Sequence, residues 1–348
     1  MHEPADAGPR CDQTLLEQLP AIVRAYQRPD GRKAAIQLLD TFLPFLSLWV
    51  AAYLLLDHSV GLALAIGMVN AMFLVRIFII QHDCGHQSFT PSRKANDLIG
   101  QVCSLITFVP YRYWTRSHNY HHGHNGLLAE HRDIGDIHTL TVKEFSALGR
   151  LGKLRYALFR SVPVLFILGP PWYLLVQNRF PLVRLPGWEA ARASLLRHDL
   201  ALVGFYALLT AALGIEAFLW VQLPMLLVFA YIALWFFYVQ HQHETAYKAP
   251  KDDWDFLRAA VHGSSHYRLP RLINWFTGDI GYHHIHHLNP LVPNYELARC
   301  QLENPVLAQV ANTIGFRQSL RCIFNKLWDE EQHRMISFRE YRRVRRGV

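Results

Sequence analysis

Residues 200–239 contain one charged side chain, that of Glu216, in forty consecutive positions. A single helix of this length would measure about 60 Å, roughly twice the thickness of a bilayer's hydrocarbon core. The segment must therefore fold back on itself, and Gly214 and Glu216 mark the expected bend. An apolar hairpin of this kind restricts the chain to a membrane protein.

Two further apolar segments precede the hairpin. They cover residues 41–56, extendable through Leu38 and Leu39, and residues 60–80, with Asp57 and His58 between them. Together with the two arms of the hairpin they predict about four transmembrane helices, and hence an all-α polytopic fold.

Two other apolar stretches do not fit a transmembrane helix. Residues 98–111 are too short, and residues 158–176 are interrupted by Pro163 and by Gly169, Pro170 and Pro171. We interpret both as interfacial or re-entrant. A single crossing by either stretch would place some of the chain's histidine clusters on opposite faces of the membrane.

The distribution of cations predicts the orientation. The turns at 57–59 and 214–216 contain no Lys or Arg, whereas the other ends of the spans are flanked by Arg28, Arg32, Lys33, Arg93, Lys94, Arg112 and Arg116. By the positive-inside rule the turns are extracytoplasmic and both termini are cytoplasmic. Residues 1–40 are mostly polar and contain four prolines, so we expect no cleavable signal there.

The net charge of +8 fits a cytoplasmic surface that faces anionic lipid headgroups, and the C-terminal FREYRRVRRGV fits the same role. A basic face would also steer an acidic electron-transfer protein toward the chain. We expect no nucleic-acid partner. The five cysteines have no zinc-like spacing and lie in segments expected in or near the cytoplasm, which indicates reduced thiols: Cys11, Cys84, Cys103, Cys300 and Cys322.

Nine of the twenty histidines form a pattern of closely spaced pairs and triplets beside apolar segments. They are His82 and His86 in QHDCGHQ, His118, His121 and His122 in SHNYHHGH, His241 in FYVQHQHE, and His283, His286 and His287 in GYHHIHHLNP. Spacings of i, i+4 and of i, i+3, i+4 project imidazoles from one face of a helix. His82 and His241 each follow an apolar segment by two residues. The clusters are therefore expected just beyond the hydrocarbon, on one side of the membrane.

Crowded imidazoles repel one another when protonated, so such clusters favour the neutral form that binds metals. A lone HxxxH pair is weak evidence, since interfacial histidines are often only hydrated; the combination of clusters is not explained in this way. Imidazole suits Zn, Cu, Fe and Ni, but eight or nine ligands exceed the coordination shell of one ion, which predicts two. Near the clusters we find no Glu-x-x-His motif of the kind that builds ferritin-like di-iron sites.

The segments HDCGH, HNYHH and HHIHH, in this order, resemble the three histidine boxes of the membrane-bound fatty acid desaturases. The flanking VQHQHET, GDIHTLTVKEF and GYHHIHHLNPLVPNY are similar to the acyl-lipid branch of that family, which includes the delta-12 (omega-6) enzymes. The resemblance covers residues 36–299 as a desaturase domain. It leaves residues 1–35 as a cytoplasmic N-terminal segment and residues 300–348 as a basic cytoplasmic C-terminal segment.

The resemblance implies four membrane helices and a cytoplasmic helical cap that holds a non-haem di-iron site. Its implied ligands are the eight histidines of the three boxes together with His241, which matches an extra histidine of the related acyl-CoA enzymes. The implied reaction uses O2 to insert a cis double bond into an acyl lipid, in a bacterial inner or plasma membrane. Electrons would come from a separate ferredoxin or cytochrome b5-type donor, because no fused haem domain with an HPGG-type signature is present.

Several residues near the boxes keep two interpretations. We expect four further histidines beside the ligands or at the surface: His124, His131, His243 and His284. Four carboxylates would either orient ligands or serve as caps and turn residues: Asp83, Asp133, Asp136 and Asp279. Phe236, Phe237 and Trp275 are candidates for the wall of a substrate tunnel, but any membrane core uses such residues, so we do not assign them.

Two other functions compete with desaturation. A hydroxylase of the same superfamily would share the ligands and differ only in whether oxygen is transferred to carbon. A metal transporter would place its ligands near mid-membrane on broken helices. No histidine lies inside the four assigned apolar segments, which argues against a transporter.

Overall fold

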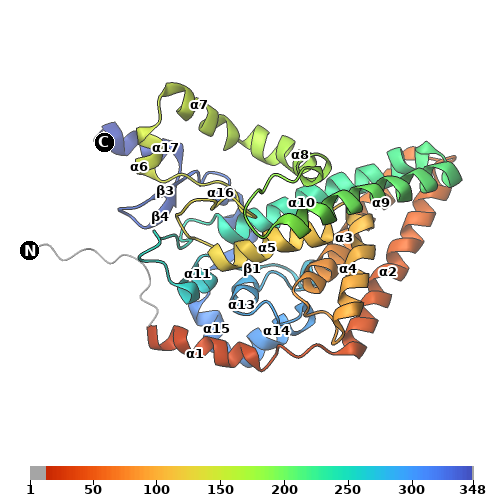
Figure 1. Cartoon of the computed structure of the whole chain (residues 1–348), viewed down its shortest axis with the longest axis horizontal. Coiled ribbons are helices and arrows are strands. Elements are labelled where there is room, and N and C mark those ends of the chain that lie inside the picture. Colours follow the sequence, from red (N-terminus) through yellow and green to blue (C-terminus); the bar gives the residue numbers. More distant parts are fainter. Residues whose placement is uncertain (1–12, 347–348) are drawn as a thin grey trace, which may run out of the picture.

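The computed structural model describes residues 13–346, and their side chains through Arg343; Cys11 and the rest of residues 1–12 and 347–348 lie outside this range. The chain is mostly helical. Long helices extend together to one side of Figure 1, and shorter helices and strands gather at their other end.

Four helices are long and apolar enough to cross a membrane: α2 (Gly31–Leu54), α3 (Val60–Gly85), α9 (Glu189–Leu213), and η3 (Ala217–Gln222) continued by α10 (Leu223–His241). This confirms the expected four spans. Asp30 begins α2 by accepting hydrogen bonds from the backbone of Arg32 and Lys33. Gly214 separates the last two helices with a φ of +82°, a left-handed value that favours glycine.

Three of these helices extend beyond the apolar segments that predicted them. α2 begins ten residues before position 41, α9 begins eleven residues before position 200, and α3 continues five residues beyond Ile80. Hydropathy marks only the part of a helix that is apolar, whereas backbone hydrogen bonds continue into polar sequence. The extension of α3 carries His82 on the membrane helix itself.

The two doubtful apolar stretches form shorter helices. Residues 98–111 divide between α4 (Arg93–Thr107), which packs against α3, and the start of α5 (Tyr111–His124), with Phe108 at a φ of +62° between them. Residues 158–176 cover the end of α7 (Arg150–Phe159), the π-helical turn η1 (Pro163–Leu168) and α8 (Gly169–Leu175). This second unit bends by 47° and would count as a fifth span only if the whole bent pair crossed. The interfacial or re-entrant interpretation stays a prediction.

The remaining elements form the helical cap, visible around the labels α11, α13 and α14 in Figure 1. They are α1 (Gln13–Arg24), α6 (Val142–Ala147), α11 (Phe256–His262), α12 (Arg271–Phe276), α13 (His283–Leu288), α14 (Asn294–Glu303), α15 (Pro305–Val310), α16 (Phe316–Cys322) and α17 (Phe338–Arg346). The short η2 (Gln177–Arg179) instead follows α8 and contacts α8 and α9. Four three-residue strands join them. β1 (His266–Arg268) pairs in parallel with β2 (Thr313–Gly315), and β3 (Leu327–Asp329) pairs antiparallel with β4 (Arg334–Ile336).

The segments at both ends of the chain contribute to the cap. α1 buries Leu16, Leu19 and Val23 and packs against α11 and α13, while β2 completes a sheet with β1. The expected boundaries after residues 35 and 299 fall inside α2 and α14. The four cysteines of the described part of the chain are buried free thiols: Cys84, Cys103, Cys300 and Cys322.

Candidate metal centre

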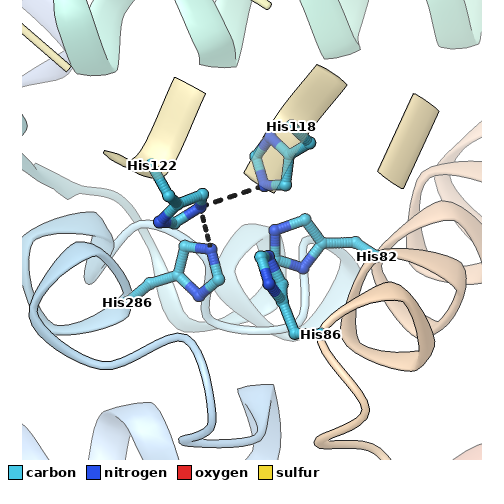
Figure 2. Close-up of side chains that lie close together, drawn as sticks. All are labelled: His82, His86, His118, His122 and His286. Atoms are coloured by element: carbon cyan, nitrogen blue, oxygen red, sulfur yellow. Dashed lines mark hydrogen bonds between the residues drawn. The ribbon is translucent and has the colours of Figure 1, made fainter. Parts of the chain in front are cut away.

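Five histidines from three separate parts of the chain converge in the cap. His82 and His86 come from the end of α3, His118 and His122 from α5, and His286 from α13. All five are buried, and one ring nitrogen of each lies within 4.8 Å of the others. Figure 2 shows the rings directed toward a common centre, with α5, α3 and α13 supplying them from different sides.

A second group lies beside the first. His121, His241 and His287 bring their ring nitrogens within 4.8 Å of one another. His283 adjoins this group, because its Nε2 lies 2.9 Å from Nε2 of His241. The structure thus gathers all nine histidines that the sequence singled out.

The three-histidine boxes do not each form one site. On α5, His118 and His122 face the first group, whereas His121 faces the second. On α13, His286 belongs to the first group and His287 to the second. These two boxes therefore contribute to both groups, whereas His82 and His86 contribute to the first alone, and the shared helices place the two groups side by side.

The arrangement fits metal ions. Two imidazoles on one zinc ion, each about 2.1 Å from it, have nitrogens about 3.0–3.4 Å apart at usual angles. The Nε2 atoms of His122 and His118 are 3.1 Å apart, those of His286 and His122 are 3.0 Å apart, and those of His121 and His241 are 3.3 Å apart. Nε2 of His82, Nε2 of His86 and both ring nitrogens of His287 are buried without a hydrogen-bond partner. Lone pairs that converge in this way, without partners, match a metal site.

Burial favours the neutral form of the following seven histidines, which is the form that binds a metal. Desolvation, followed by the charge of neighbouring histidines, lowers the pKa of His118, His122 and His286 well below its ordinary value. The same causes act on the pKa of His86, His283 and His287. For His121 burial again lowers the pKa, while the nearby Asp136 acts in the opposite direction.

Two ring nitrogens turned away from the centres have fixed partners. Nδ1 of His82 donates to Oδ1 of Asp83 at 2.9 Å, and Nδ1 of His241 donates to the carbonyl of Gly263 at 3.1 Å. Asp136 lies farther off, with Oδ2 3.9 Å from Nδ1 of His121. Among the described residues, neither Asp133 nor Asp279 pairs with a histidine. Asp279 sits in a turn with a φ of +54°.

The four additional histidines lie apart from both groups. His284 is buried and donates to Gln301 Oε1 at 3.1 Å, and His243 donates to the carbonyl of Ser264 at 3.2 Å. His124 bonds to the carbonyl of Tyr120 and stacks on its ring. His131 is exposed and has a φ of +61°.

Three contacts of the site were not anticipated from the sequence. Asn294 donates two hydrogen bonds to the carboxylate of Asp83, and the carbonyl of Gly263 accepts a hydrogen bond from His241. Trp114 stacks on His118 with ring centroids 4.5 Å apart. The Trp114 contact had a signal, since the two residues are four apart on one helix. The other two join distant segments and had none.

A cavity of about 1480 Å³ adjoins the histidines. His82, His118 and His283 line it, and its other walls are largely apolar, with Phe78 from α3, Trp172 from α8 and Ala233 from α10. Phe236 and Phe237 also line it, whereas Trp275 is not among its lining residues and instead lies against Arg76. Small-molecule sites typically measure about 300–1,000 Å³, so this cavity has room for a long apolar chain.

The sequence of the chain is similar to known proteins over most of its length. The family model "Fatty acid desaturase" matches residues 58–313. A "Fatty acid desaturase" of Bacillus subtilis is 42% identical over 328 residues, which cover 94% of this chain and 92% of the relative. The "sn-1 oleoyl-lipid 12-desaturase" of a Synechocystis strain is 27% identical and covers 64% of this chain and 63% of its own length. The "sn-1 acyl-lipid omega-3 desaturase (ferredoxin)" of a Nostoc strain is 27% identical over 75% of this chain and 71% of its own.

Proposed function

The chain belongs to the fatty acid desaturase family of oxidoreductases, and from that premise we propose that it inserts a cis double bond into an acyl chain carried by a membrane lipid, as a delta-12 (omega-6) enzyme. The observation that carries the proposal is the cavity. His82, His118 and His283 line this largely apolar space, so an acyl chain lying in it would contact the histidine groups.

Nine histidines are the proposed ligands of two non-haem iron ions. His82, His86, His118, His122 and His286 would hold one ion; His121, His241, His283 and His287 would hold the other. When bound, the irons would supply O2 activation and the oxidising power to remove hydrogen from an unactivated methylene, which no side chain provides. The balance is one acyl chain, O2, two electrons and two protons giving one double bond and two waters.

The protein's own groups hold the ligands and keep the site dry. Asp83 keeps the proton of His82 on Nδ1, so that Nε2 faces the centre, and the Gly263 carbonyl does the same for His241. All nine histidines are buried, so bulk water does not compete with the substrate at the site.

The names of the relatives support a lipid substrate without deciding the position of the double bond. The Synechocystis protein is a 12-desaturase and the Nostoc protein an omega-3 desaturase, at the same 27% identity. The delta-12 assignment rests on the flanking segments of the histidine boxes. An omega-3 product is the competing outcome.

The electron donor is proposed to be a separate protein, of the ferredoxin or cytochrome b5 type. The name of the Nostoc relative specifies ferredoxin. The net charge of +8 would favour encounter with an acidic donor.

The site is proposed to face the cytoplasm of a bacterial inner or plasma membrane. The turns at 57–59 and 214–216 lack Lys and Arg, and they lie at the opposite ends of the membrane helices from the histidines. By the positive-inside rule those turns are extracytoplasmic.

Expression in a host that lacks polyunsaturated lipids tests the function. Gas chromatography with mass spectrometry of the cellular fatty acids should show a new diene from an 18-carbon monoene, two mass units lighter than its precursor. The His286→Ala variant, expressed to the same membrane level, serves as the control and should give none. A product sixteen mass units heavier than its precursor would identify a hydroxylase instead, and unchanged fatty acids with a competent donor present would refute the proposal.

A further inference from the structure

We propose that Asn294 is a positioning residue for one of the two metal ions. Through Asp83 it fixes His82, and thereby sets how tightly the five-histidine group holds its ion. The inference rests on the proposed metal-binding function and goes beyond it, because it assigns a role to a residue outside the histidine boxes and restricts that role to one group.

The first link joins His82 to Asp83. Nδ1 of His82 donates to Oδ1 of Asp83 at 2.9 Å, and both side chains are almost fully buried. With the proton held on Nδ1, the lone pair of Nε2 is free, and Nε2 is the buried nitrogen without a protein partner. The carboxylate therefore selects the tautomer that directs Nε2 to the centre.

The second link joins Asp83 to the start of α14. Oδ2 of Asp83 accepts one hydrogen bond from the backbone N–H of Asn294 at 2.6 Å and another from its Nδ2 at 2.8 Å. Pro293, which precedes the helix, provides no side-chain cap. Asp83 thus serves as the cap of α14, and the partial positive charge of that helix end stabilises the carboxylate.

The third link fixes the Asn294 amide itself. Its Oδ1 accepts from Nε2 of Gln37 at 2.9 Å, so its Nδ2 must face Asp83. Gln37 lies on α2, within the first membrane span. All three polar residues are at most 3% exposed, so water does not replace these bonds. A buried chain of hydrogen bonds therefore runs from the first span to a histidine of the site.

The two groups differ in this respect. Among the described residues, Asp83 is the one carboxylate with an oxygen within 3.5 Å of a ring nitrogen of the nine histidines. In the second group, His241 has a neutral carbonyl as its partner, and Asp136 is 3.9 Å from His121. A carboxylate partner makes an imidazole a better ligand than a carbonyl partner does. Loss of the Asn294 amide should therefore weaken the binding of the ion in the five-histidine group and leave the binding of the other ion unchanged.

The test compares Asn294→Ala with Asn289→Ala in purified, iron-loaded full-length protein. Asn289 follows the same histidine box and also makes two side-chain hydrogen bonds, to Gln27 and to the backbone of Leu291, but it does not contact Asp83. In Asn294→Ala we expect one of two irons to be lost to a chelator about 10–100-fold more readily than in the wild type. The Mössbauer spectrum of the ⁵⁷Fe protein should change at one of its two sites. Asn289→Ala should match the wild type in both measurements.

Equal loss of both irons in Asn294→Ala, or retention identical to that of Asn289→Ala, would overturn the inference. If Asn294→Ala does not accumulate in the membrane, Asp83→Asn replaces it, since it keeps the size of the side chain but supplies one acceptor oxygen where His82 and Asn294 together need two. The same one-iron loss is expected, and two tightly held irons in Asp83→Asn would overturn the inference. Wild-type protein that is active with fewer than two irons would refute the proposed metal centre itself, which separates the two failures.

Discussion

Replacing His286 and His284 separately by alanine tests the proposed ligand set, because the two residues lie on one short helix but their side chains point to different surroundings. His286 belongs to the five-histidine group, with Nε2 3.0 Å from that of His122. His284 points away and donates to Gln301. We expect His286→Ala to reduce iron from about two to about one per chain and to abolish desaturation, since no neighbouring group replaces the lost bond.

His284→Ala should instead reduce stability. The change removes a fully buried imidazole and leaves Oε1 of the buried Gln301 without its donor. A cavity and an unpaired acceptor together cost about 2–4 kcal/mol of unfolding free energy. Iron should remain at about two per chain. Activity per folded molecule should fall by no more than about 10- to 100-fold, the range expected for a residue that supports a ligand.

The assay combines iron analysis of purified protein, thermal unfolding in detergent, and desaturase activity normalised to membrane-inserted protein. His284→Asn offers a matched variant that keeps a donor near Gln301 and should recover part of the stability. The reasoning is refuted if His284→Ala loses an iron while His286→Ala keeps two and remains active, with both variants folded.

Three further predictions concern topology, the cavity and pH. Single cysteines at Asp57 and Glu216 should react with an impermeant reagent from outside the cell, and those at Ser92 and Lys251 only after permeabilisation; labelling of Lys251 in sealed cells would refute the orientation. Ala233→Trp, in the cavity wall, should lower desaturation of an 18-carbon chain at least about tenfold with iron retained, while Leu208→Trp on the exposed face of α9 should not; equal activity of the two would exclude the cavity as the acyl site. Burial lowers the pKa of His266 to about 4, so the unfolded chain binds a proton there that the folded chain does not between pH 6.5 and 4. Stability should therefore fall as the pH drops below about 6.5, by up to about 2 kcal/mol at pH 5 from this residue, and the slope of the wild type should exceed that of His266→Gln in thermal unfolding; parallel slopes would contradict it.

The sequence predicted those features of the fold that depend on local pattern. Forty residues with one charge required a hairpin, and the bend is at Gly214 as expected. The spacing of His118 and His122 placed both on one face of a helix, and they do face a common centre. Helical periodicity and hydropathy are properties of residues that are close in the sequence, so they can be predicted from the sequence alone.

The division of the histidine boxes between two groups depended on tertiary structure. Spacing showed that His121 lies near His122, but only the tertiary structure sends the two rings to different groups. His121 meets His241 at the end of α10, and His122 meets His286 of α13. Hydropathy also failed to predict where the helices begin, since α2 and α9 start in polar sequence that precedes their apolar segments.

The chain by itself determined a helical membrane protein with a histidine cluster suited to metal binding, because burial in lipid and metal binding each require residue types that are visible in sequence. The folded molecule alone decided which groups support that centre and what reaches it. Asp83 meets Asn294 across 211 positions, and the cavity walls come from eight helical elements and the loops between them. Contacts of this range depend on how helices pack, and no spacing within a short segment encodes them.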